Sequence, residues 1–231
     1  MPIKQLAEGL HVIRGLVNVY LLETTGGLAL VDSGFPGSAG KILRGIRSLG
    51  KKPSDIRHIL LTHAHPDHIG SAAALKRETG AMVWAHPLDA PIIETGSGFR
   101  DAHACPGLRN RILASLLRGR ILKVEPTRVD RLLQDGESPS FAPDLTAIHV
   151  PGHCAGQLAF HWQRHGGVLL PADTCVNRRG LKLPVAAEDL DLARGSLDKL
   201  RGLTFESICF MHGRPIMAGG DAHFRRAWAA Q

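Results

Sequence analysis

Runs of apolar residues and the turn residues between them divide the chain into predicted strands and helices. The chain opens with short extended runs that turn back at Gly26 and Gly27, a pattern typical of an antiparallel meander. Its predicted strands are 10–14, 17–22 and 28–31. Apolar residues spaced by three and four then predict an amphipathic helix, which Pro36 and Ser38 introduce and cap and Gly50 ends.

The rest of the chain alternates between strands and helices. Further strands are predicted at 56–61, 82–85, 129–133, 145–150, 156–162, 168–170 and 207–210. Helices are predicted at 72–78, at 190–203 and from 220, with a helical, loop-rich segment over 87–120. Two blocks of strands, each interleaved with helices, predict a layered α/β domain in which two sheets face each other and helices cover the outside. Since no linker, repeat or low-complexity tract divides the sequence, we expect one domain over residues 1–231.

The overall composition is that of a soluble globular protein. Of the 231 residues, 44% are hydrophobic and 21% are charged, so a core can form without disulfide or metal staples. The sequence contains no run approaching the roughly 18 apolar residues of a membrane span, and its start lacks the features of an export signal. The four cysteines are far apart, which favours reduced thiols. We therefore expect a cytoplasmic protein.

The charge balance is basic but diffuse. Lysine and arginine number 28 against 21 acidic residues, a net charge of +7 that favours anionic ligands. Only 5% of residues are aromatic, which leaves few stacking platforms and argues against a nucleic-acid partner. We expect a small-molecule substrate and no membrane contact, and a homodimer is compatible with the sequence.

Histidine changes this picture because several of its 13 copies cluster tightly. His63, His65, Asp67 and His68 lie within six residues, directly after a predicted buried strand. In an extended or tightly turned segment His63 and His65 project to the same side and can share one cation, while Asp67 and His68 can reach a second. Imidazole and carboxylate at this density suit zinc or another borderline divalent metal. A surface histidine cluster is the alternative, but the position after a buried strand makes it a poor explanation.

Three more candidate ligands share one position in the predicted fold. His153, Asp173 and His212 each follow the end of a predicted strand. Taken singly, each is more typical of a structural loop residue. Together they point to a cleft on which the ends of several strands converge.

These residues, taken in order, form a recognisable set. The set is Asp32, then His63-x-His65-x-Asp67-His68, then His153, Asp173 and His212. It resembles the five-motif signature of the metallo-β-lactamase fold superfamily, and the resemblance runs from about residue 10 to about residue 215. It implies a four-layer αββα sandwich with a two-metal site at one edge, between the sheets.

The resemblance also implies roles for single residues. The implied ligand sets are His63, His65 and His153 for one metal, Asp67, His68 and His212 for the other, and Asp173 as the bridge. Asp32 would orient the ligands from outside the metal sites. Two positions depart from the family pattern, because Ala172 and Met211 stand where many relatives have glycine. We interpret the nearby Cys154 and Cys175 as packing residues.

A dinuclear centre predicts hydrolysis. Two divalent cations about 3.5 Å apart can hold one water, lower its pKa to near neutrality and polarise a carbonyl or phosphoryl oxygen. We therefore predict a hydrolase that uses a bridging hydroxide on two metal ions, with Zn2+ first and Mn2+ or Fe2+ as alternatives. Asp67 would orient the hydroxide and carry a proton to the leaving group. The predicted substrate is a small-molecule carbonyl ester, lactone or related bond.

Several alternatives stay open. A β-lactamase of the His-x-His-x-Asp-His type would normally be exported. A thioesterase or RNA-processing nuclease would need a domain that the short segment after His212 does not supply. A phosphodiesterase is a further candidate. A lactonase would commonly carry a tyrosine after the bridging aspartate, whereas the only tyrosine here is Tyr20. A mononuclear iron oxidoreductase is disfavoured by the presence of His68 and His212. A non-catalytic metal-binding module is disfavoured because structural zinc sites are usually closed four-ligand sets.

Two surface segments each allow two interpretations. Residues 96–123 are expected to form a flap over the cleft, or else a helix packed on the core through Leu108 and Leu116. Arg178, Arg179 and Lys182 follow Asp173 closely, and they either attract an acidic substrate or form a solvated basic loop.

Overall fold

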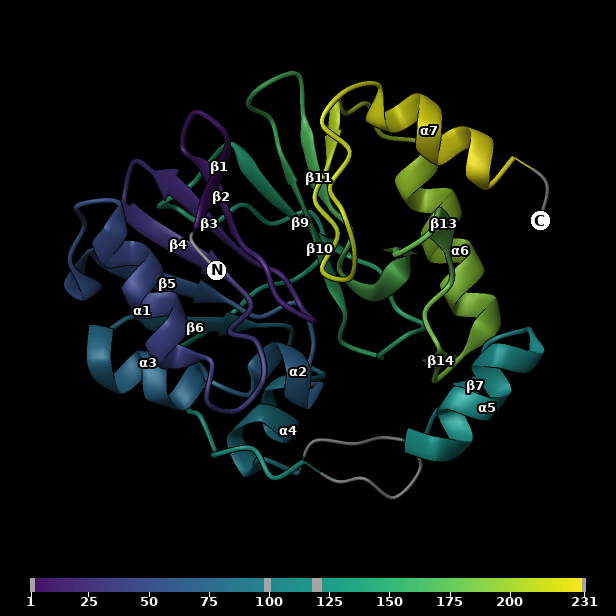
Figure 1. The fold of residues 1–231 in the computed structure, drawn as a ribbon, viewed down its shortest axis with the longest axis horizontal. Helices are drawn as coiled ribbons and strands as arrows, with labels where there is room; N and C mark the ends of the chain where they lie inside the picture. The colour runs from purple at the N-terminus through teal and green to yellow at the C-terminus, as the bar shows by residue number, and fades with distance from the viewer. Residues whose placement is uncertain (1–2, 98–100, 118–121, 230–231) are drawn as a thin grey trace.

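Two β-sheets face each other in the computed structural model, which describes residues 3–97, 101–117 and 122–229 (Figure 1). One sheet has seven strands in the order β1-β2-β3-β4-β5-β6-β8, and the other has four in the order β15-β11-β10-β9. Helices lie on the outer face of each sheet (Figure 1). This arrangement confirms the predicted αββα sandwich.

The first sheet is antiparallel at one edge and parallel at the other. Its strands are β1 (Lys4–Ala7), β2 (Leu10–Ile13), β3 (Val19–Thr24), β4 (Gly27–Val31), β5 (Ile56–Leu60), β6 (Met82–Ala85) and β8 (Arg131–Leu132). β2, β3 and β4 pair antiparallel as the predicted meander, and β1 adds a further antiparallel strand at its edge. From β4 to β8 the strands pair in parallel, because the intervening helices return the chain to the same end of the sheet. The carboxyl ends of β4, β5 and β6 therefore lie at one edge.

The second sheet is built from the carboxyl-terminal half of the chain. Its strands are β9 (Leu145–His149), β10 (Leu158–Trp162), β11 (Val168–Leu170) and β15 (Ser207–Ile208). β9, β10 and β11 pair antiparallel, and β15 joins β11 in parallel. Two ribbons stand apart from both sheets: β12 (Val176–Asn177) with β13 (Leu181–Lys182), and β7 (His103–Ala104) with β14 (Ala186–Ala187).

Alternating side chains sort the strands' residues into separate core layers. On β3, Tyr20 and Leu22 face the space between the sheets, whereas Leu21 faces the helices. On β10, Phe160 and Trp162 enter the same inter-sheet core from the other side. Both of these aromatic residues are fully buried. The inter-sheet core thus holds together the two halves that supply the candidate ligands.

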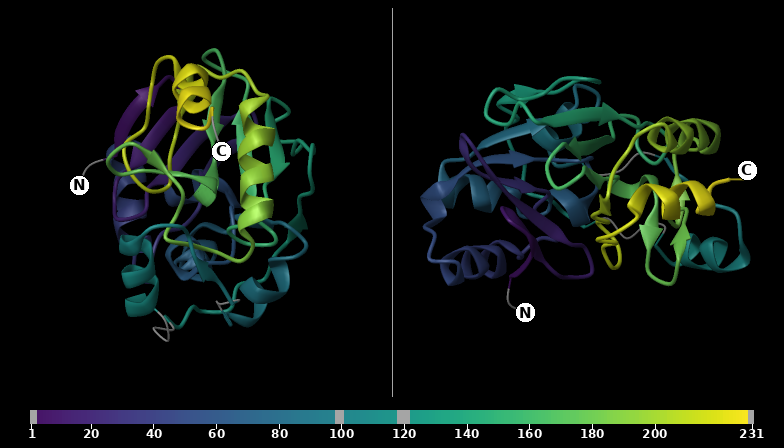
Figure 2. Two further views of the ribbon diagram at one scale, coloured as in Figure 1. Left: turned by 90° about the vertical axis from the view of Figure 1, so that its right-hand side faces the viewer. Right: turned by 90° about the horizontal axis from the view of Figure 1, so that it is seen from above.

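The outer layers are amphipathic helices. α1 (Ala39–Ser48) and α3 (Ala72–Thr79) cover the first sheet, and α6 (Leu190–Arg201) and α7 (Gly220–Ala227) cover the second (Figures 1 and 2). Shorter helices are α2 (Pro66–Ile69), α4 (Ala90–Thr95) and α5 (Leu108–Leu117), with single 3-10 turns at Pro53–Asp55 and Ala172–Thr174. None of the helices within the described ranges combines the length and the apolar composition that crossing a bilayer requires.

One predicted cap takes a different form. Ser38 occupies the N-cap position of α1, but with respect to the described residues its hydroxyl bonds to none of the helix N–H groups. Its backbone N–H instead donates to Ser71 Oγ at 2.8 Å. The predicted capping by the Ser38 side chain is therefore wrong, because its φ of −76° and ψ of −16° are already helical rather than extended.

The segment over 96–123 is only partly described, since 98–100 and 118–121 lie outside the described residues. Leu108, Ile112 and Leu116 on α5 are 73%, 52% and 59% exposed, so the alternative of a helix packed on the core through these residues is wrong. The start of the segment is attached to the second half of the molecule, because β7 pairs with β14. Movement as a flap stays a prediction. All four cysteines are outside disulfides and buried, which fits the interpretation of Cys154 and Cys175 as packing residues.

Candidate metal centre

The His-x-His-x-Asp-His segment leaves β5 at the carboxyl end of the parallel strands. His65 is extended at the N-cap of α2, and Pro66 follows at a position where its fixed φ suits a helix start. Asp67 and His68 therefore lie in the first turn of α2. Ser33, at the end of β4, holds this turn in place, because its N–H and its hydroxyl both donate to His68 O, at 2.7 and 2.8 Å.

The second half of the molecule brings in the remaining candidates at strand ends. His153 follows β9, Asp173 lies in the 3-10 turn after β11, and His212 follows β15. Beside His153 and His212 the structure requires glycine, because no space is left for a side chain. Gly152 and Gly213 have φ of 128° and 117°, and a Cβ on either would overlap the backbone of a neighbouring segment. The close approach of these segments places the ligand loops at the edge of the sandwich.

All seven predicted side chains meet at this edge, and three of them form a first set. His63 Nε2 lies 3.1 Å from His65 Nδ1, and His153 Nε2 lies 3.0 Å from the same nitrogen. Ligand atoms about 2.0–2.1 Å from a tetrahedral zinc lie about 3.3–3.4 Å from one another. The three nitrogens are thus spaced closely enough to share one ion.

A second set lies beside the first. Asp67 Oδ2 lies 3.5 Å from His212 Nε2 and 3.7 Å from His68 Nε2. Asp173 Oδ2 lies between the sets, at 3.1 Å from His212 Nε2 and 3.7 Å from both His68 Nε2 and His153 Nε2. One carboxylate oxygen is therefore within reach of both groups, the arrangement that a bridging ligand needs.

Each of the five rings has its other nitrogen on an outer partner. The partners are Thr62 Oγ1 for His63, Cys154 Sγ for His65, Asp32 Oδ2 for His68, Ala186 O for His153 and Leu16 O for His212. A carbonyl oxygen can only accept a hydrogen bond, so Nδ1 of His153 and of His212 carries the proton. The Nε2 atoms of both rings then face the centre, as metal binding requires.

Asp32 and Thr62 are the fully buried residues among these partners. The Asp32 carboxylate accepts hydrogen bonds from the Thr62 N–H at 2.8 Å, from the Thr62 hydroxyl and from His68 Nδ1 at 2.8 Å. The φ of Asp32, 65°, lies in the left-handed region, which aspartate tolerates better than most residues. The structure thus places Asp32 outside the candidate centre, in contact with a ring of the second set.

The two sets differ in their electrostatics. Burial, followed by the neighbouring rings, lowers the pKa of His63 well below its usual value and that of His65 to about 3. Burial also lowers the pKa of His153. The first set is therefore neutral at neutral pH, and its nitrogens are available to a cation.

The second set consists of ion pairs. Burial opposes protonation of His68 and His212, but nearby carboxylates outweigh it, raising the pKa of His68 and bringing that of His212 to about 9. Burial likewise opposes ionisation of Asp173 and Asp67, yet the adjacent rings hold the pKa of both carboxyls below the usual value. A metal ion at this set would replace protons.

Two buried atoms indicate that the centre is built for a further group. Considering the residues that the structure describes, His68 Nε2 and Asp173 Oδ1 are buried and have no hydrogen-bond partner. Both belong to candidate ligands, and groups of these side chains place ligand atoms within 4.8 Å of one another. Imidazole nitrogens with carboxylate oxygens are the donors that zinc takes, so the residues present fit a divalent metal.

The family model of the metallo-beta-lactamase superfamily matches residues 12–212, which include every candidate ligand. The chain belongs to this superfamily.

Three relatives within the superfamily give the range of similarity. The uncharacterized protein YobT of Bacillus subtilis (strain 168) is 33% identical over 71% of this chain, which spans 64% of that protein's length. The probable metallo-hydrolase YflN of the same organism is 27% identical over 92% of this chain and 86% of its own. An N-acyl homoserine lactonase of a Bacillus species is 25% identical over 79% and 74%.

A solved structure shows the same fold. BJP-1, a subclass B3 metallo-beta-lactamase of Bradyrhizobium japonicum, superposes with a TM-score of 0.74 at 25% identity. The alignment covers 99% of this chain and 90% of that one.

The two departures from the superfamily pattern have different structural costs. Ala172, before Asp173, has a φ of 52°, in the left-handed region that favours glycine. The turn that presents Asp173 is therefore strained by about 1–2 kcal/mol. Met211, before His212, is fully buried in the inter-sheet core, where a glycine would leave a cavity. Only the first departure costs backbone strain.

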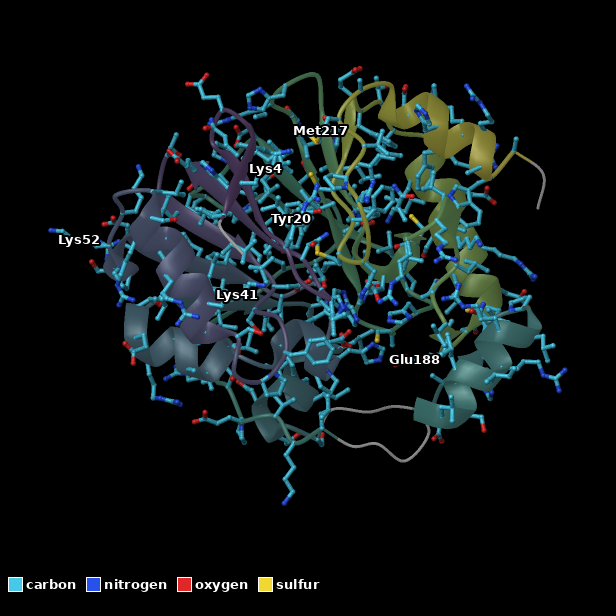
Figure 3. All side chains as sticks on the ribbon, in the orientation of Figure 1. Lys4, Tyr20, Lys41, Lys52, Glu188 and Met217 are labelled. Carbon is cyan, nitrogen blue, oxygen red and sulfur yellow. The ribbon has the colours of Figure 1, made fainter. Side chains whose placement is uncertain are left out.

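Several residues that support the centre escaped the sequence analysis. Leu16 O and Ala186 O are backbone groups, so no residue type marks them. Tyr20, labelled in Figure 3, donates to Phe210 O at 2.8 Å and so ties the segment before His212 to β3. Cys154, interpreted as a packing residue, is buried, but its Sγ also lies 3.3 Å from His65 Nε2. Cys175 is fully buried, as expected of packing.

The basic residues after Asp173 lie on the ribbon of β12 and β13. Arg178 Nη2 lies 3.1 Å from His212 Nδ1, so this guanidinium reaches the edge of the second set. Arg178, Arg179 and Lys182 are exposed. Arg178 is the member of this group that the structure brings to the candidate centre.

Proposed function

We propose that the chain is a metal-dependent hydrolase with a dinuclear zinc centre, which cleaves a carbonyl ester, lactone or related bond in a small molecule. The observation that carries the proposal is the position of Asp173 Oδ2, within 3.7 Å of ring nitrogens from both sets. Membership of the metallo-beta-lactamase superfamily and the similarity to a probable metallo-hydrolase and a lactonase support it.

The residues would divide between two metal sites. His63, His65 and His153 would hold one ion, Asp67, His68 and His212 the other, and Asp173 would bridge them. Two bound divalent cations would lower the pKa of a shared water and polarise the substrate carbonyl. The protein's own part is to fix the ring nitrogens, which the outer partners of the five histidines accomplish by setting which nitrogen faces inward.

Asp67 is the proposed proton carrier. Its side chain is 25% exposed, whereas those of His68 and Asp173 are almost fully buried, so it is the second-set carboxylate that solvent and substrate can reach. The adjacent His68 and His212 rings keep the pKa of its carboxyl below the usual value despite burial. Asp67 is therefore ionised at neutral pH and can orient a water, accept its proton and deliver that proton to the leaving group.

A β-lactamase is the second candidate function. The superposition with BJP-1 over 99% of this chain supports it. Turnover of the chromogenic cephalosporin nitrocefin tests this reaction directly. Rapid turnover of nitrocefin, together with none of esters and lactones, would replace the first proposal by the second.

The decisive experiment is a substrate panel. Lactones, aryl esters, thioesters and phosphodiesters would be tested against protein reconstituted separately with zinc, manganese and iron, and metal content would be measured in each sample. We expect about two zinc ions per chain and turnover of esters or lactones. His63→Ala and Asp173→Ala should abolish turnover while circular dichroism and melting show a folded chain. Undiminished rates in either variant, or a single bound iron with no hydrolysis, would contradict the proposal.

A further inference from the structure

A buried aspartate outside the ligand motifs connects the two segments that carry the first set. Asp89 lies at the start of α4, after β6, and its relative exposure is 1%. Its Oδ2 accepts a hydrogen bond from Ala64 N at 2.9 Å, and its Oδ1 accepts one from Gly156 N at 3.1 Å. Ala64 stands between His63 and His65, and Gly156 follows His153 by three residues. One carboxylate thus holds both ligand segments by their backbones.

The residue that faces the Asp89 carboxylate, Gly156, leaves room for it because it has no side chain. A Cβ at residue 156 would overlap the Asp89 carboxylate, so only glycine lets the oxygen reach the amide. The φ of Gly156 lies outside the left-handed region, so space rather than backbone conformation requires this glycine. Asp89 stands directly before a helix, where aspartate is a common N-cap, and this explains why the sequence alone gives it no further role. In the structure, with respect to the described residues, its side chain makes no cap bond to α4.

The second set is held by other contacts. Ser33 fixes the backbone of His68, Asp32 fixes its ring, and Leu16 O fixes the ring of His212. The segment that carries His153 has one more carboxylate contact, because Ala155 N donates to Glu188 Oε2 at 2.8 Å (Glu188 is labelled in Figure 3). Glu188 holds the His153 segment in this way, and Asp89 joins that segment to the one with His63 and His65.

We propose that Asp89 is a positioning residue that sets the first metal site and leaves the second almost untouched. This inference rests on the metal centre of the proposed function. Replacing the carboxylate by an amide keeps one acceptor but turns an NH2 group toward a backbone N–H. The two segments should then separate, and His153 Nε2 should lose its 3.0 Å spacing from His65 Nδ1. Loss of such an outer contact typically weakens metal binding about 10–100-fold.

The test measures zinc affinity site by site. Zinc would be titrated into metal-free protein in competition with a chromophoric chelator. The backgrounds His212→Ala and His153→Ala isolate the first and the second set. We expect Asp89→Asn to weaken zinc binding about 10–100-fold in the His212→Ala background and less than about threefold in the His153→Ala background. Unchanged affinity in the first background, or equal losses in both, would overturn the inference.

Two further variants separate positioning from general destabilisation. In Gly156→Ala the added methyl group displaces the Asp89 carboxylate, so this variant should show the same loss of zinc affinity at the first set. Combining it with Asp89→Ala should cause no additional loss of zinc affinity. Gly156→Ala also carries the test if Asp89→Asn does not fold. Asp130→Asn is the matched control, because Asp130 accepts a hydrogen bond from Val83 N at 2.8 Å at the far end of β6. A similar loss of zinc affinity in that control would count against a specific role for Asp89.

The outcomes also separate this inference from the proposed function. A wild-type chain that binds no zinc would remove both. A wild-type chain that binds two zinc ions and hydrolyses esters, with an Asp89→Asn variant of the same affinity at both sites, would remove only the inference about Asp89.

Discussion

Replacing Asp32 by asparagine tests whether the orientation of His68 controls the second metal site. Asparagine has the same shape and tolerates the left-handed φ of 65° at this position, so the backbone is not disturbed. Its oxygen can still accept from Thr62 N. Its NH2 group, however, would face His68 Nδ1 at the present 2.8 Å spacing, and that nitrogen is itself a donor. The ring must then move its proton to Nε2 or rotate, and either change takes the lone pair away from the metal.

The size of the effect follows from these contacts. A hydrogen bond to a buried charged group contributes about 1.5–3 kcal/mol, which is the expected loss in free energy of unfolding of the metal-free chain. Loss of an outer partner of a metal-bound histidine costs about 10–100-fold in affinity, or about 1.4–2.8 kcal/mol. Since Asp32 touches a ring of the second set, the second zinc should show this loss and the first should not.

Chelator competition measures both zinc affinities, and urea unfolding without metal measures stability. Asp144→Asn is the control, because Asp144 pairs with Arg164 at 2.6 Å and contacts none of the candidate ligands within the described ranges. It should leave both zinc affinities unchanged. If Asp32→Asn bound the second zinc as tightly as the wild type, the argument from ring orientation would be refuted.

Four further predictions follow from other parts of the molecule. The raised pKa values of His68 and His212 mean that zinc must displace protons from these rings. Affinity for the second zinc should therefore fall as the pH is lowered below about 9, by up to tenfold per pH unit for each proton displaced. Chelator competition at several pH values would show this fall, and an affinity that does not change with pH would contradict it. Ala172→Gly removes a strained φ of 52° and should raise the free energy of unfolding by about 1 kcal/mol in urea; a loss of stability would contradict the strain. Phe160→Ala empties a fully buried position between the sheets and should cost about 3–5 kcal/mol by the same measurement. Arg178→Ala should raise KM for esters that carry a carboxylate and leave KM for neutral esters unchanged, because its guanidinium lies 3.1 Å from the His212 ring; equal effects on both substrates would exclude such a contact.

The fold was predictable wherever one face of an element is buried. The strands and helices that pack on the three core layers carry clear periodicity, and their predicted positions are confirmed within a few residues. β1 was missed because Lys4–Ala7 is exposed or half-buried along its length, so it carries no apolar pattern. β8 and β15 are shorter than predicted, at two residues each. Apolar runs there continue beyond the hydrogen-bonded ladder, and periodicity does not report where pairing ends.

The sequence predicted the candidate ligands of the site but not the groups that hold these ligands in position. Ring and carboxylate residues at strand ends are visible in the sequence, and the structure brings all seven together. Backbone acceptors such as Leu16 O carry no mark of residue type. Asp89 is recognisable in the sequence as an acidic residue, but its contacts with Ala64 and Gly156 join segments that are distant in the sequence. Such pairings arise only when the fold brings those segments together.

The order of the ligands along the chain has a consequence for biosynthesis. His63, His65 and His153 are all synthesised before β15 and His212, and Asp173, the proposed bridge, precedes them as well. A nascent chain in which β9, β10 and β11 have packed against the first sheet therefore presents three neutral imidazoles while the second set is still incomplete. Metal capture would begin at the first set, and the second would close when β15 docks beside β11 and brings His212 into place.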